Sequence, residues 1–111
     1  MIELEPNHAI AAQLGDGERL LAVRMRAVLE RRGTPGGDAA ELAGHLYLTS
    51  RRLVFLGRVV HSFELADLAE VILYGSGLLV LTRGGKGLRL EVDQPRLLRG
   101  QIAAARSPTG G

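Results

Sequence analysis

Apolar and polar positions alternate along most of this chain, and near residue 93 the period changes from that of a strand to that of a helix. Apolar segments separated by turns with Gly, Ser or Asp run from residue 45 to residue 92. An alternation of period two is typical of half-buried strands. It predicts seven strands, at residues 18–29, 45–49, 53–56, 59–65, 70–74, 78–82 and 88–92. Short strands at this spacing favour an antiparallel sandwich or barrel.

The first of these segments is also compatible with a helix, because Leu, Ala, Met, Arg and Glu all favour helices. We favour a strand because apolar and basic residues alternate from residue 23 onward. The strand would place four apolar side chains on one face: Val23, Met25, Ala27 and Leu29.

Helical patterns occur at both ends of the chain. Residues 6–14 could form a short helix with Asn7 as its N-cap. After Asp93 and Pro95, a stripe with helical spacing predicts an amphipathic helix to about residue 106. The stripe consists of Leu98, Gln101, Ile102 and Ala105, widened by Leu97. We therefore expect an N-terminal extension at 1–17, one domain at 18–106 and a disordered tail at 107–111.

The longest segment without a periodic pattern is 31–44. It contains Gly33, Pro35, Gly36 and Gly37, which favour turns and irregular backbone. We expect a mobile loop here, and Asp38 and Glu41 resemble a helical capping pair that is compatible with a single turn.

Length and composition exclude several classes of protein. A chain of 111 residues with 46% hydrophobic residues can build one modest core. The longest apolar run is too short to span a membrane, and the acidic start MIELEPNHAI does not resemble a secretory leader. The absence of cysteine excludes disulfides, thiolate metal sites and a cysteine nucleophile. We expect a cytoplasmic protein.

The formal net charge is only +2, but arginine supplies all the basic residues except Lys86. Arginine binds phosphate and carboxylate groups through its planar guanidinium. A compositional bias toward Ala, Gly, Leu and Arg explains the same count. No basic run or aromatic platform accompanies the arginines, so we expect no nucleic-acid partner.

No catalytic or metal-binding constellation stands out. The three histidines, His8, His45 and His61, lack metal-ligand spacing. We expect His61 to be a half-buried residue at the edge of the core. The sequence GGKG at 84–87 precedes a predicted strand, which favours a hairpin turn over a phosphate-binding loop. We expect no enzyme activity, no metal and no cofactor.

The stretch GHLYLTSRRLVFLG, at 44–57, carries a family resemblance. It resembles the hairpin of GRAM and bacterial pleckstrin-homology (PH)-like domains through Gly44, Leu46, Tyr47, Leu48, Thr49, Arg52, Leu53 and Phe55. GDGERLL at 15–21 resembles the start of the first strand of that family, and FELADLAEV at 63–71 resembles the approach to its fifth strand. The resemblance implies a bent seven-stranded antiparallel sandwich or barrel, closed by a C-terminal helix.

The resemblance also implies a binding module rather than an enzyme. Some relatives bind lipid headgroups through loops at one end of the sandwich, and others bind proteins. In this sequence those loops would carry five basic residues: Arg31, Arg32, Arg58, Arg83 and Lys86. We expect protein–protein or self-association to be the main role, and binding of an anionic lipid headgroup at the inner face of the membrane is the alternative.

The pair Arg51–Arg52 could bind an acidic group, or it could only form the corner of a hairpin. Neighbouring residues on a strand face opposite sides, so the pair cannot readily grip one phosphate together. Thr49 and Ser50 can shape the turn by bonding to the local backbone. We expect both arginines to serve stability, at the end of the sandwich opposite the ligand loops.

Overall fold

The computed structural model describes residues 3–31 and 40–106, and Arg32 and the predicted tail at 107–111 lie outside them. The described chain is mainly β, with a seven-stranded antiparallel sheet and a C-terminal helix. Its elements are α1 (His8–Ala11), β1 (Leu20–Arg31), β2 (Ala40–Thr49), β3 (Arg52–Leu56), β4 (Val60–Glu64), the 3-10 turn η1 (Leu65–Asp67), β5 (Leu68–Tyr74), β6 (Gly77–Thr82), β7 (Gly87–Val92) and α2 (Pro95–Arg106). No helix within these ranges has the length and apolar character needed to cross a membrane.

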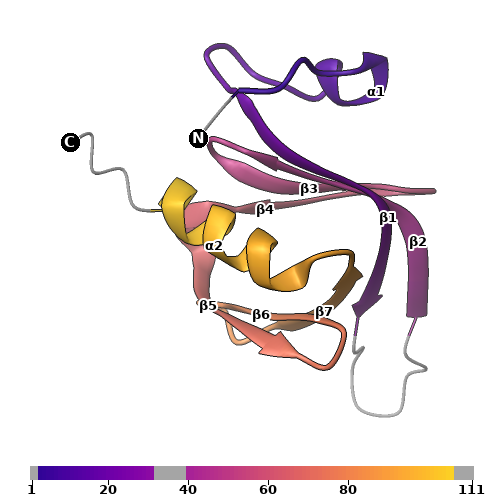
Figure 1. Ribbon diagram of the computed structural model, residues 1–111, viewed down its shortest axis with the longest axis vertical. Coiled ribbons are helices and arrows are strands. Elements are labelled where there is room, and N and C mark those ends of the chain that lie inside the picture. Colours follow the sequence, from indigo (N-terminus) through magenta and orange to yellow (C-terminus); the bar gives the residue numbers. More distant parts are fainter. Residues whose placement is uncertain (1–2, 32–39, 107–111) are drawn as a thin grey trace.

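The sheet bends strongly but does not close. Its strand order is β4-β3-β2-β1-β7-β6-β5, so β4 and β5 are the two edges. Figure 1 shows the strands β5–β7 below the strands β3 and β4, with α2 lying between the two halves. The predicted strand content and terminal helix are confirmed, whereas the closed-barrel alternative is wrong because no ladder joins β4 to β5.

An irregularity in β1 allows the bend. The pairing of β1 with β2 shifts register between Arg24 and Ala27, and β1 pairs with β7 only from Ala27 onward. A bulge of this kind changes the face to which the following side chains point. Ala27 is therefore buried in the core, whereas Met25 is 56% exposed. The predicted single apolar face of β1 is wrong for that reason.

The second strand begins earlier than its sequence predicts. β2 starts at Ala40, so residues 40–44 belong to the sheet rather than to a loop. The remaining residues of the predicted loop, 32–39, lie outside the described part of the chain. Gly44 interrupts the alternation of apolar and polar residues in β2. A glycine stands there because its place in the strand leaves no room for a side chain. A Cβ there would lie 2.9 Å from the ring of Phe55 and 3.0 Å from the Cα of Gly57.

The main core lies inside the bend and is covered by α2. Its most deeply buried members, all 2% exposed or less, are Leu29, Leu46, Leu48, Leu53, Phe55, Leu68, Leu78, Val80, Leu90, Leu98 and Ile102. Leu98 and Ile102 confirm the predicted helical stripe, but Leu97 is 52% exposed and does not widen it. His61 is half-buried, and its ring stacks on that of Phe63, in agreement with the prediction of a core-edge histidine.

A second, smaller core lies on the opposite face of the sheet. It consists of Ile10, Leu20, Tyr47 and Val54, all 1% exposed or less. Ile10 reaches this site from α1, which is shorter than the predicted helix and is capped by Asn7 Oδ1 accepting from Ile10 N at 3.1 Å. In Figure 1, α1 lies on the far side of β1 and β3 from α2. The N-terminal segment therefore packs against the sheet instead of extending from it.

The space available for a side chain differs between Gly44 and Gly100, and this difference can be tested. We expect Gly44→Ala to lower the free energy of unfolding by about 1–3 kcal/mol, because the added methyl group would press against Phe55 and Gly57. Gly100 lies in α2, where an added Cβ meets nothing within 4 Å. Gly100→Ala should stabilise the protein by up to about 1 kcal/mol, as alanine favours helices. Urea unfolding of both variants checks this, and equal stabilities would contradict the assigned packing.

Candidate functional site

The basic residues predicted to bind a ligand, as far as the structure describes them, lie at the end of β1 and in two turns between strands. Arg31 is the last residue of β1, and Arg32 lies outside the described residues. Arg58 lies in the turn between β3 and β4, and Arg83 and Lys86 lie in the turn between β6 and β7. The backbone of Arg31 is paired with that of Leu88, so the end of β1 lies beside the start of β7.

Arg58 is separated from Arg83. Arg83 lines a groove together with Glu64, which pairs with Arg52 at one end of the β3–β4 hairpin. Arg58 lies beyond the opposite end of that hairpin, where Leu56 pairs with Val60. Strands of this length span about 13 Å. The structure therefore does not gather Arg58 and Arg83 into one site.

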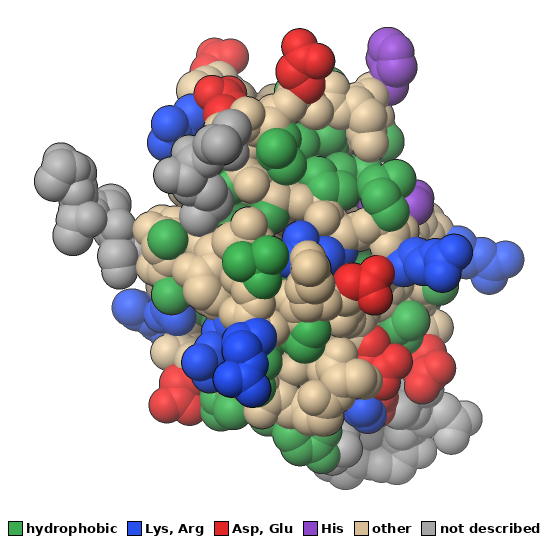
Figure 2. All heavy atoms as spheres, viewed as in Figure 1, with side chains coloured by type: hydrophobic (Ala, Val, Ile, Leu, Met, Phe, Trp, Pro, Cys, Tyr) green, Lys and Arg blue, Asp and Glu red, His purple; other side chains and the backbone are tan. Residues whose placement is uncertain are grey.

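The same groove corrects the expected position of the Thr49–Arg52 turn. Ser50 and Arg51 of this turn line the groove together with Arg83. The expectation that the turn lies opposite all three ligand loops is therefore wrong for the β6–β7 turn. On the face seen in Figure 2, Lys and Arg side chains form several separate clusters, with acidic and apolar side chains between them.

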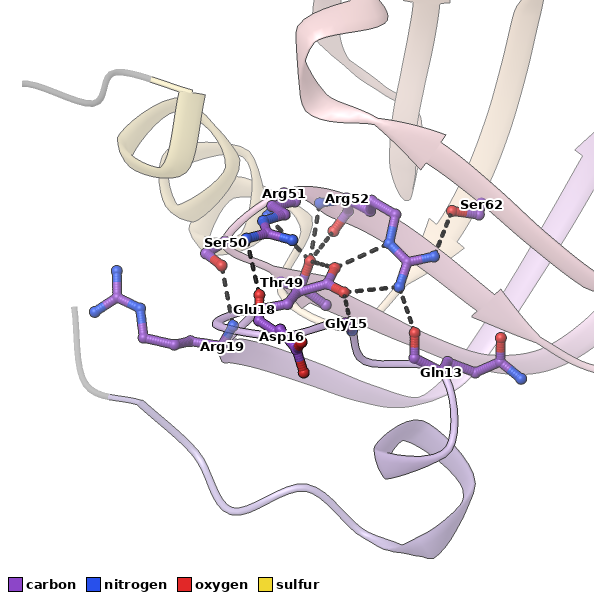
Figure 3. A network of polar contacts seen from close by, with 10 residues as sticks. All are labelled: Gln13, Gly15, Asp16, Glu18, Arg19, Thr49, Ser50, Arg51, Arg52 and Ser62. Atoms are coloured by element: carbon purple, nitrogen blue, oxygen red, sulfur yellow. Dashed lines mark hydrogen bonds and ion pairs between the residues drawn. The ribbon is translucent and has the colours of Figure 1, made fainter.

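The two arginines of the turn have different environments, as Figure 3 shows. Arg52 donates from Nε to Glu18 Oε2 at 2.9 Å and from Nη2 to Glu18 Oε1 at 2.8 Å. Its side chain is 19% exposed and that of Glu18 only 2% exposed. Arg51 extends the other way and donates to the backbone oxygen of Asp16 at 2.9 Å. Arg52 therefore belongs to a buried ion pair, whereas Arg51 stays on the surface.

Thr49 completes this network. Its hydroxyl donates to Glu18 Oε2 at 2.6 Å and accepts from the backbone N–H groups of Arg51 and Arg52. Arg52 also donates to the backbone oxygen of Gln13 at 2.6 Å. The network thus ties the segment before β1 to the turn between β2 and β3, which confirms that Thr49 shapes the turn.

The network changes the acidity of Glu18. Hydrogen bonds from Arg52 lower the pKa of Glu18 from 4.5 to about 2, against burial, which acts to raise it. Hydrogen bonds from Gly15 and Thr49 act in the same direction as those from Arg52. Glu18 is therefore charged at neutral pH, with its acceptor capacity used within the protein. Such a carboxylate is suited to holding structure and not to proton transfer.

Three arginines surround a groove of about 370 Å³, here called the arginine groove. They come from separate segments: Arg51 from the β2–β3 turn, Arg83 from the β6–β7 turn and Arg106 from the end of α2. Its other lining residues are Ser50, Glu64, Leu65, Ala66 and Ala105. This groove collects more positive charge than any connection that the sequence singled out.

A second groove of about 260 Å³ runs between the edge strand β5 and α2, here called the β5–α2 groove. Its lining is apolar at Val71, Ile102 and Ala103, open at Gly100, and basic at Arg99 and Arg106. Arg106 lines both grooves and donates to the backbone oxygen of Leu68 at 2.6 Å. The two grooves therefore meet at Arg106.

Sequence reasoning missed Arg99 and Arg106 as binding candidates. Both lie on the predicted C-terminal helix, for which the sequence pattern indicated only an apolar stripe. Their spacing of seven residues places them on one side of the helix, which was the available signal. Their proximity to β5 depends on tertiary packing and had no sign in the sequence.

A third and larger cleft, of about 610 Å³, lies at the bulge of β1. It is lined by Met25, Arg26, Ala27, Val28, Ala43, Gly44, His45, Ser76, Glu91, Val92 and Asp93. His45 Nδ1 is hydrogen-bonded to the backbone oxygen of Met25. No group of three or more His, Asp or Glu side chains in residues 3–31 and 40–106 could hold a metal ion.

Comparison with known proteins supports the fold alone. No family model matches the chain, and no curated protein matches it either. The crystal structure of the C-terminal domain of an unknown protein from Leishmania infantum is similar, with a TM-score of 0.64 and 19% sequence identity. The similarity covers 81% of this chain and 85% of that one.

The different environments of Arg51 and Arg52 predict different effects of substitution. Arg52→Ala leaves Glu18 charged and buried without its partner, which should cost about 3 kcal/mol of folding free energy. Arg51→Ala removes one exposed hydrogen bond and should cost less than about 1 kcal/mol. Urea unfolding at pH 7 measures both. Equal losses in the two variants would contradict the assignment of Arg52 to a buried ion pair.

The lowered pKa of Glu18 also predicts a dependence on pH. Since the pKa is lower in the folded state than the ordinary value of 4.5, the stabilisation is complete above pH 4.5. It decreases as the pH falls from 4.5 toward about 2, where folded Glu18 takes up its proton. The difference in unfolding free energy between wild type and Glu18→Gln should therefore be larger at pH 7 than at pH 3. A constant difference would show that Glu18 is not held as the charged form.

Proposed function

We propose that this chain is a non-enzymatic PH/GRAM-like binding module that takes up an extended, acidic segment of a partner protein along β5. The observation that carries this proposal is the β5–α2 groove beside an unpaired sheet edge.

The assignment to the PH/GRAM-like class is supported by the hairpin and the architecture together. The residues that resemble the family lie on β2, β3 and the turn between them. A bent seven-stranded antiparallel sheet with a C-terminal helix is the arrangement that the resemblance implies. Gly44, at the start of the resemblance, also has a packing reason to be glycine.

The edge of β5 offers main-chain groups to a partner. β5 pairs with β6 on one side only, over Leu68–Tyr74. A sheet edge with unpaired N–H and C=O groups can accept a further strand, which supplies affinity without regard to sequence. Ile72 is 40% exposed and Tyr74 is 47% exposed. These two side chains widen the apolar surface that a strand on β5 would meet.

The charge of the groove favours an acidic occupant. Arg99 and Arg106 lie on its rim, whereas none of the residues that line it is acidic. Between them, Val71, Gly100 and Ile102 provide a floor for a small apolar side chain. An extended segment with one apolar residue flanked by Asp or Glu matches this lining better than a second copy of the chain, because β5 itself carries only Glu70.

Binding to an anionic membrane is the second candidate, and one observation favours it. The turn between β3 and β4 carries Arg58 beside Val59 and Val60, which are 57% and 46% exposed. Exposed apolar residues beside a cation suit the boundary between headgroups and acyl chains. Since Arg83 lies elsewhere, this turn would act with fewer basic residues than the sequence suggested.

Selection of binding peptides from a random library tests the main proposal. We expect the selected peptides to be acidic and to shift the amide resonances of β5 and α2 in an NMR titration. Gly100→Leu should weaken their binding at least tenfold, because its side chain fills the β5–α2 groove while the helix tolerates a Cβ at this position. Arg58→Ala is the matched control and should bind as the wild type does.

Three outcomes would contradict the proposal. One is a set of peptides that perturb other strands, and another is undiminished binding by Gly100→Leu. The third is sedimentation with vesicles of anionic lipid that is abolished by Val59→Ser and Val60→Ser, with no peptide recovered. Light scattering that shows a concentration-dependent dimer would replace the foreign segment by a second copy of the chain.

A further inference from the structure

Within the part of the chain that the structure describes, the arginine groove holds an excess of positive charge. Among the described residues, Arg51, Arg83 and Arg106 form no ion pair within 4 Å, although Arg52 and Arg89 do. Glu64 lines the same groove and is its single acidic residue. Three guanidinium groups around one carboxylate leave a local excess of two positive charges at neutral pH.

Backbone oxygens orient two of these arginines. Arg106 Nη2 donates to the oxygen of Leu68 at 2.6 Å, and Arg51 Nη2 donates to the oxygen of Asp16 at 2.9 Å. Arg83 is fixed at its backbone, where its N–H donates to the oxygen of Asp67 at 2.8 Å. Because a carbonyl leaves the charge of its donor in place, these contacts position the guanidinium groups and keep them attractive to an anion. Each guanidinium also has further N–H groups to offer.

A hydroxyl adds a fourth donor. Ser50 Oγ accepts from the backbone N–H of Arg19 at 3.0 Å, which leaves its own proton free to donate. Figure 3 shows Ser50 and Arg51 next to each other in the turn. Several arginines and a hydroxyl suit a tetrahedral oxyanion with two charges, such as a phosphate monoester, better than a single carboxylate.

We infer that the arginine groove binds a phosphate monoester, and that the group is carried by the partner segment in the β5–α2 groove. The position of the phosphate rests on the proposed function, through Arg106, which lines both grooves. The arginine groove contains Leu65 and Ala66, immediately before β5, whereas the other groove contains Val71. A strand paired along β5 therefore reaches the arginines about five residues beyond its residue opposite Val71, counted toward Leu68 and Ala66. Phosphorylation of that residue would strengthen binding.

An NMR titration tests the site without a peptide. The probes are inorganic phosphate and N-acetyl-phosphoserine amide, and the readout is the set of backbone amide and arginine Nε–H resonances. We expect both probes to shift the resonances of Ser50, Arg51, Arg83 and Arg106. Arg83→Ala should weaken binding at least tenfold without loss of folding, because the side chain of Arg83 is exposed. Arg96→Ala removes the same charge from an exposed position that lines none of the described grooves and should leave binding unchanged.

Equal weakening by Arg96→Ala and Arg83→Ala would overturn the site, since it would show general attraction by surface charge. Binding of vesicles that contain phosphatidic acid, lost in Arg83→Ala, without any response to N-acetyl-phosphoserine amide, would assign the groove to a membrane and overturn the protein-borne phosphate. A selected peptide whose affinity does not rise when it carries phosphoserine about five residues beyond its residue opposite Val71, on the side of Leu68, would do the same. Failure of the peptide selection alone, with phosphate still bound at Arg83, would instead count against the β5–α2 groove.

Discussion

The buried ion pair between Glu18 and Arg52 is the interaction on which the arrangement of this molecule depends. It joins the segment that precedes β1 to the turn between β2 and β3, and Thr49 closes the network from the same turn. The pair is held by two hydrogen bonds between guanidinium and carboxylate. A pair with this geometry offsets the cost of removing two charges from water, whereas one of the charges alone would not. The N-terminal segment is consequently fixed above the second core.

The same contact gives the two neighbouring arginines different roles. The guanidinium of Arg52 donates hydrogen bonds to Glu18, Gln13 and Ser62. Arg51 remains exposed, with one contact to a backbone oxygen. The expectation that Arg51 and Arg52 have the same structural role therefore does not suit Arg51. The alternation rule stated that they face different ways, but it did not reveal that one would be buried and the other would border a groove.

Sequence patterns predicted the elements well where local chemistry determines them. The alternation in β7, the stripe of Leu98 and Ile102, and the glycine-rich turn near Lys86 all follow from neighbours within a few residues. The predictions failed where pairing between distant segments decides. Met25 and Ala27 share an apolar face in the sequence, but the bulge separates them. The two grooves had no sign in the sequence, since they form only when α2 packs beside β5 and the Thr49–Arg52 turn meets the β6–β7 turn.

The place of β1 in the sheet has a consequence for how the chain folds. Every strand pair except one joins strands that follow each other along the chain. The exception pairs β1 with β7, where Glu30 lies opposite Arg89. Local hairpins close short loops, whereas this ladder must wait for a long one to close and therefore forms late. The strands β1–β4 and β5–β7 can each assemble as a meander, and the register of the whole sheet is set when the second half of β1 meets β7.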